Sequence, residues 1–160
     1  LGDWCTSHRG PLPGWPVGRS VRIATPDCMP ACSRRGIDFV EEDSCHHAET
    51  AKDPHAKDGQ PIPYSELYGR MRDALNKTGR PIVFYMCVQG QENVQEWGPT
   101  TGNLWRTTGD ICGPGHATWG GVIRNFYGDT RYPNSTMVGA WQDPDSARFV
   151  HCFRVCCRQC

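Results

Sequence analysis

The chain has 160 residues, with 17 basic and 17 acidic side chains, and its formal net charge is zero. The absence of a basic patch argues against a nucleic-acid partner, and no apolar run approaches the roughly 20 residues of a membrane-spanning helix. The high and even count of 10 cysteines favours disulfides in an oxidising compartment, and the N-terminus lacks the pattern of a signal peptide.

The chain divides into three segments by the regularity of its pattern. Residues 1–35 are rich in Gly, Pro and Arg and are predicted to be irregular, apart from a short strand over 21–24. Residues 36–145 carry regular apolar patterns and are predicted to form the folded domain. Residues 146–160 are predicted to form an irregular Cys-rich tail.

The folded domain is predicted to begin with a strand over 37–42, which is rich in β-branched and aromatic residues. A helix over 66–77 follows, with Ser65 as its N-cap and Gly79 just beyond its end. Its apolar stripe has helical spacing and consists of Leu67, Met71, Ala74 and Leu75. The continuous apolar run over 82–88 predicts a strand that is covered on both faces.

Three further elements complete the domain. They are a short strand over 103–107, a helix around 117–127 and a last strand over 137–141. The alternation of strands and helices predicts α/β units with a parallel sheet.

Acidic residues lie at the ends of two of these strands. Asp43 follows the first strand and Asp110 follows the third, so parallel strands would bring both carboxylates to one edge of the sheet. Two carboxylates that flank one sugar bond are the minimal equipment for glycoside hydrolysis. Taken alone, Asp43 fits a solvated loop better than a catalytic site, Asp110 also fits a loop or a helix cap, and Asp143 with Asp145 also fits a turn around Pro144.

Four sequence runs occur in a fixed order along the folded domain: GIDFVEEDSC, RMRDALNKTGRPIVFYMC, GNLWRTTGDI and WQDPD. Together they resemble the middle of glycoside hydrolase family 27, the α-galactosidase and α-N-acetylgalactosaminidase family. The resemblance covers about residues 36–145. It implies a partial (β/α)8 barrel, because a complete barrel takes roughly 200 residues or more.

The resemblance implies a retaining glycosidase that acts on terminal α-linked galactose-type residues and needs no cofactor. Asp43 would be the nucleophile and Asp110 the general acid/base. The implied substrate-binding positions are Glu41, Cys87, Arg106, Asp143 and Asp145. Family members usually have lysine at the position of Glu41, so the charge beside Asp43 is reversed here.

The resemblance also implies a disulfide between Cys45 and either Cys28 or Cys32. A secreted, lysosomal or vacuolar location is expected, and sequons at Asn76 and Asn134 are compatible with secretion. The first-strand Asp pair of the family has no counterpart before residue 36, so low turnover is expected from this chain.

Two alternative functions stay open. The first is a non-catalytic carbohydrate-binding relative, which Glu41 and the missing early Asp pair favour. The second is a Cys-rich structural or zinc-binding module. Its candidate ligands are His151, Cys152, Cys156, Cys157 and Cys160, whose spacing fits disulfides better than a four-ligand zinc site.

Overall fold

The computed structural model describes residues 20–22, 36–43, 47–52, 56–111 and 118–145. Within them lies a five-stranded sheet in the order β1-β2-β3-β4-β5. The strands are β1 (Ser20–Arg22), β2 (Phe39–Asp43), β3 (Val83–Cys87), β4 (Leu104–Arg106) and β5 (Trp141–Asp143). Every neighbouring pair is parallel, which confirms the predicted parallel α/β fold.

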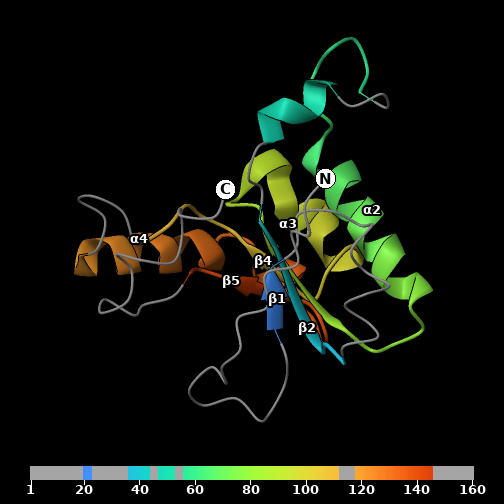
Figure 1. The fold of residues 1–160 in the computed structure, drawn as a ribbon. Helices are drawn as coiled ribbons and strands as arrows, with labels where there is room; N and C mark the ends of the chain where they lie inside the picture. The colour runs from blue at the N-terminus through green and yellow to red at the C-terminus, as the bar shows by residue number, and fades with distance from the viewer. Residues whose placement is uncertain (1–19, 23–35, 44–46, 53–55, 112–117, 146–160) are drawn as a thin grey trace.

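Helices connect the strands from β2 onward, as parallel pairing requires. They are α2 (Tyr64–Lys77) before β3, α3 (Val94–Trp97) before β4, and α4 (Trp119–Thr130) before β5. Short 3-10 segments accompany them: η2 (His47–Lys52), η3 (Gln91–Asn93), η4 (Gly98–Thr100) and η5 (Pro133–Ser135). Figure 1 shows α2 and α3 beside one part of the sheet, and α4 beside β4 and β5. None of the described helices is long and apolar enough to cross a membrane.

The two ends of the sheet differ from the sequence prediction. The short strand that was predicted over 21–24 is present as β1, which covers 20–22 and pairs with β2, so the sheet begins before residue 36, where the folded domain was predicted to start. The last strand covers 141–143, and the prediction of 137–141 is wrong in position. Met137 and Ala140 instead exchange backbone hydrogen bonds of 2.9 and 3.0 Å across a tight turn in which Gly139 has a φ of 86°.

The start of α2 also differs from the prediction. Ser65 lies inside the helix, and the N-cap position is Pro63, which offers no side-chain acceptor. The carboxylate of Glu92 accepts hydrogen bonds from the backbone N–H groups of Tyr64 and Ser65 at 3.1 and 3.4 Å. A distant acidic residue therefore satisfies the free N–H groups that a cap residue usually satisfies.

The hydrophobic core lies between the sheet and α2. Alternate residues of β2 and β3 are buried on the helix-facing side, among them Val40, Phe84 and Met86. Tyr68, Met71 and Leu75 cover them from α2. The predicted apolar stripe is confirmed at Met71 and Leu75, which are buried. Leu67 was predicted to belong to the stripe but is only half-buried, and Tyr68, which was not predicted, is buried. Trp105 of β4 is fully buried in the same core.

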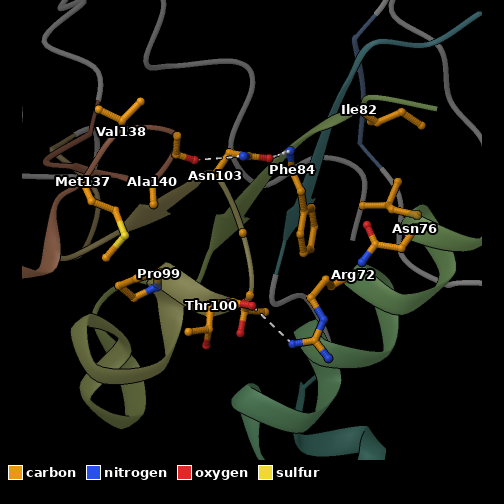
Figure 2. A pocket seen from close by; sticks show the side chains of 14 residues that line it. Arg72, Asn76, Ile82, Phe84, Pro99, Thr100, Asn103, Met137, Val138 and Ala140 are labelled. Atoms are coloured by element: carbon orange, nitrogen blue, oxygen red, sulfur yellow. Dashed lines mark hydrogen bonds between the residues drawn. The ribbon is translucent and has the colours of Figure 1, made fainter. Parts of the chain in front are cut away.

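A cavity of about 300 Å³ lies where the strands begin, between α2, η4 and the turn at 137–140. Figure 2 shows Asn103 beside this cavity, where its side chain accepts from the Phe84 N–H and donates to the Gly139 carbonyl, both at 2.9 Å. Barrel enzymes perform their chemistry at the opposite, carboxyl ends of the strands. The cavity is therefore not the candidate active site.

Candidate active site

The strands leave one face of the sheet uncovered by α2. Side chains alternate between the two faces of a strand, so the burial of Val40 and Glu42 against α2 places Glu41 and Asp43 on the other face. We call this second face the inner face, because it would line the interior of a barrel. It carries the acidic residues at the strand ends.

The strand register arranges the inner face in two rows. The lower row consists of Glu41, Tyr85, Leu104 and Trp141, which are partners in register. The upper row lies nearer the carboxyl ends of the strands and consists of Asp43, Cys87, Arg106 and Asp143. In the upper row, a guanidinium nitrogen of Arg106 lies 4.0 Å from the Cys87 sulfur. The lower row is largely apolar and the upper row is charged.

Arg106 binds two carboxylates that follow the strands. Its guanidinium lies 3.1 Å from the Asp110 Oδ1 and 3.0 Å from the Asp145 Oδ1, and it also donates to the Thr108 carbonyl at 3.1 Å. The side chain is only 3% exposed. Burial by itself lowers the pKa of Arg106, but Asp145 and the other nearby acidic groups raise it above its usual value. Arg106 is therefore a fixed cation.

The Asp145 carboxylate connects the two loops that leave β4 and β5. Its Oδ2 accepts from the Ile111 backbone N–H at 2.7 Å, while its own N–H donates to the Asp143 Oδ1 at 2.7 Å. Asp145 has a φ of 83°, which lies in the left-handed region. Its backbone conformation is thus held by contacts from both loops, as is common for residues at functional sites.

Two neutral groups lie between the carboxylates. Burial, and then the neighbouring Asp143, raise the pKa of the Tyr85 phenol, which hydrogen-bonds to Asp143. Burial also raises the pKa of the Cys87 thiol, and the negative charges of Asp43, Glu41 and Asp110 raise it further. Both groups therefore stay protonated near neutral pH. The Tyr85 hydroxyl donates its proton to Asp143, whereas the Cys87 thiol can donate a hydrogen bond to a bound hydroxyl.

The structure brings the sequence-predicted site residues to one edge of the sheet. Glu41 lies in the lower row, while Asp43, Cys87, Arg106 and Asp143 form the upper row. Asp110 and Asp145 join them through Arg106. The sequence interpretation missed Tyr85, although the alternation of side chains in the run over 82–88 puts it on the same face as Cys87.

Other predictions concern residues outside the described ranges. These are the pairing of Cys45 with Cys28 or Cys32 and the Cys-rich tail with its candidate zinc ligands. Within the described ranges, no group of three or more His, Cys, Asp or Glu side chains is arranged to hold a metal ion.

The loop after β3 approaches the loop after β4 very closely. The N–H of Gly90 donates to the Arg106 carbonyl at 2.9 Å, and Gly90 has a φ of 78°. A Cβ at this position would lie far closer to the Thr107 carbonyl oxygen than van der Waals contact allows. Gly90 therefore allows two site-bearing loops to touch.

Replacing Gly90 by Ala is expected to lower the free energy of unfolding by about 2 kcal/mol, because strain at positive φ adds to a clash with the backbone. Gly59 is the matched control, because it has a φ of 66° and open space around its missing Cβ. Gly59→Ala is expected to cost about 1 kcal/mol, the conformational part alone. Denaturant titration measures the free energy of unfolding of both variants. Equal losses would show that the close approach to Thr107 does not add to the cost of replacing Gly90.

A parallel sheet with helices on its outer face and carboxylates at its carboxyl edge is typical of (β/α)8-barrel enzymes. No protein-family model matches the chain. An α-galactosidase of Schizosaccharomyces pombe is 43% identical over 76 residues, which are 48% of this chain and 16% of that protein. A protein of Dictyostelium discoideum described as a probable α-galactosidase is 34% identical over 110 residues, which are 69% of this chain and 24% of the relative.

Solved structures show the same fold. The α-galactosidase of Saccharomyces cerevisiae matches with a TM-score of 0.54 at 24% identity, over 73% of this chain and 28% of that one. A family 27 β-L-arabinopyranosidase of Geobacillus stearothermophilus matches with a TM-score of 0.56 at 21% identity, over 75% and 25% of the two chains. The chain belongs to glycoside hydrolase family 27, the melibiase-like family, and it matches about a quarter of the length of these relatives.

Proposed function

We propose that this chain carries the catalytic edge of a retaining glycoside hydrolase of the α-galactosidase type. The observation that supports this most directly is the upper row, where Asp43 ends β2 and the fixed cation Arg106 holds Asp110 at the same edge. A retaining mechanism requires the two carboxyl groups to lie about 5 Å apart across the sugar bond.

The proposed reaction is a double displacement. The Asp43 carboxylate forms a bond to the anomeric carbon while the glycosidic bond breaks, and Asp110 gives its proton to the leaving oxygen. Asp110 then takes a proton from water, whose oxygen attacks the anomeric carbon and displaces Asp43. Neither step needs a metal or an organic cofactor.

The remaining polar groups of the edge suit a sugar substrate. Carboxylates such as Asp143 and Asp145 accept hydrogen bonds from sugar hydroxyls, while the Cys87 thiol can donate one. Arg106 is buried and already bonded to both Asp110 and Asp145, so its proposed role is to hold these carboxylates in place. A structure of the Saccharomyces cerevisiae α-galactosidase holds raffinose, and the fold it shares with this chain supports an α-galactoside as the substrate. The exposed sequon residues Asn76 and Asn134 support a secreted glycoprotein or a lysosomal or vacuolar location.

The proposal is tested with aryl α-galactosides at high protein concentration and long incubation. We expect slow release of the aryl alcohol from the α-galactoside and none from the β-galactoside. Proton NMR of the first sugar product should show the α-anomer, because two inversions give retention. A β-anomer as the first product would contradict the assignment of Asp43 as nucleophile.

A carbohydrate-binding relative without activity is the second candidate. Glu41 supports it, because an acidic side chain takes the place of the usual lysine directly below Asp43 on the inner face. This candidate predicts galactose binding, measured by saturation-transfer NMR, without release of the aryl alcohol. Absence of both binding and hydrolysis would contradict both candidates.

A further inference from the structure

Helix α4 runs close to the loop that leads from β4 to Asp110. The Asp129 carboxylate accepts a hydrogen bond from the Thr107 hydroxyl. A Cβ on Gly128 would lie 2.5 Å from the Thr108 Cγ2, so the glycine permits this approach. Neighbouring residues of α4 therefore approach neighbouring residues of the loop.

Asn125 is the next contact along this line. It is 1% exposed, and its amide nitrogen donates to the Gly109 carbonyl at 2.7 Å and to the Pro144 carbonyl at 3.0 Å. Both hydrogens of the amide are thus used, one in each loop. Gly109 and Pro144 directly precede Asp110 and Asp145, the two carboxylates that Arg106 binds.

We propose that Asn125 is a positioning residue that holds the Asp110 loop and the Asp145 loop together beneath the substrate. It touches neither carboxylate and acts through the backbone carbonyl that precedes each. A displacement of about 1 Å in the placement of an acid or a sugar-binding group is enough to cost about a hundredfold in rate. The role in catalysis rests on the proposed function, whereas the coupling of the two loops does not.

The second bond between the loops provides a direct readout. The Ile111 N–H donates to the Asp145 Oδ2 at 2.7 Å, so it is protected from hydrogen exchange only while the loops stay together. Replacing Asn125 by Leu keeps the volume and removes both donors. We expect exchange of the Ile111 amide to accelerate about tenfold, the size that the loss of one to two net hydrogen bonds gives.

Asn103→Leu is the matched control. Asn103 is also a bridging asparagine, but it binds the Phe84 N–H and the Gly139 carbonyl at the opposite end of the strands. Asn103→Leu should accelerate exchange of the Phe84 amide and leave that of Ile111 unchanged, after correction for global stability. Asn125→Leu should do the reverse. If Asn125→Leu does not fold, Asn125→Ser, which can reach one carbonyl at most, should show a smaller acceleration at Ile111.

The proposal would be overturned if Asn125→Leu and Asn103→Leu accelerated exchange of the Ile111 amide equally, because Asn125 would then only stabilise the fold. A second measurement uses hydrolysis. Asn125→Leu should slow an alkyl α-galactoside more than an activated aryl α-galactoside, because only the poor leaving group needs the proton of Asp110. If the unmodified chain hydrolyses neither substrate, the proposed function fails, and hydrogen exchange still decides whether Asn125 couples the loops.

Discussion

Replacing Asp43 by Asn is expected to lower the turnover of an aryl α-galactoside by about ten-thousandfold or more, the loss typical of removing a nucleophile. An amide cannot form the glycosyl ester that a retaining mechanism requires. Asp43 lies at the end of β2 in the upper row, in register with Cys87. The substitution keeps the shape of the side chain, so the loss should come from chemistry and leave the stability nearly unchanged.

Trapping of the intermediate measures this effect even when turnover is slow. A fluorinated α-galactosyl fluoride reacts readily, but its glycosyl-enzyme hydrolyses slowly, so mass spectrometry should find one added glycosyl group on Asp43. Asp38→Asn is the matched control, because Asp38 lies just before the same strand and forms an exposed ion pair with Arg80 at 2.7 Å. The control should be labelled like the unmodified chain. Labelling of Asp43→Asn to the same extent would assign the nucleophile elsewhere.

The parts of the fold that the sequence predicts well are those in which a local pattern and the tertiary environment agree. The continuous apolar run over 82–88 predicts β3, which covers 83–87, because a strand buried on one face and facing a barrel interior on the other needs few polar residues. Gly79 was expected to follow the end of α2, and its φ of 68° is the conformation that ends a helix.

The predictions failed where a distant contact replaced a local signal. Serine is a common N-cap residue, but Ser65 lies inside the helix. Glu92, which is 27 positions away in sequence, accepts the hydrogen bond from the Ser65 backbone N–H instead. The apolar run over 137–140 looks like a strand, but a turn that includes Gly139 forms instead and binds to Asn103. Asn125 gives no signal in the sequence, because its importance comes from two backbone carbonyls that only the fold brings together.

Glu42 carries a buried carboxyl group. The sequence interpretation placed this residue in a strand but did not predict its burial. It is 2% exposed and lies on the helix-facing side of β2, opposite to its neighbours Glu41 and Asp43. Its Oε2 has no hydrogen-bond partner among the described residues. Burial therefore raises the pKa of Glu42 well above its usual value.

This shift makes the stability depend on pH in a definite direction. The folded state holds the proton of Glu42 at a pH where the unfolded chain has already released it. The stabilising effect is therefore fully present below about pH 4.3, the pKa of an unfolded glutamate, and it is lost as the pH rises through the folded pKa. At pH 7.5 the carboxyl group of Glu42 is a cost to the fold.

Replacing Glu42 by Leu is accordingly expected to raise the free energy of unfolding by about 3 kcal/mol at pH 7.5, because an apolar side chain of similar size needs no partner in the core. At pH 4.5 the gain should be clearly smaller, since the carboxyl group is then protonated in the folded chain and only about half ionised in the unfolded chain. Denaturant titration at the two pH values measures the difference. Glu96→Leu is the control, because Glu96 is exposed on α3 and its replacement should change the stability by about 0.5 kcal/mol or less at either pH. A gain at Glu42 that is the same at both pH values would mean that this group does not titrate with folding and that only its shape or packing matters.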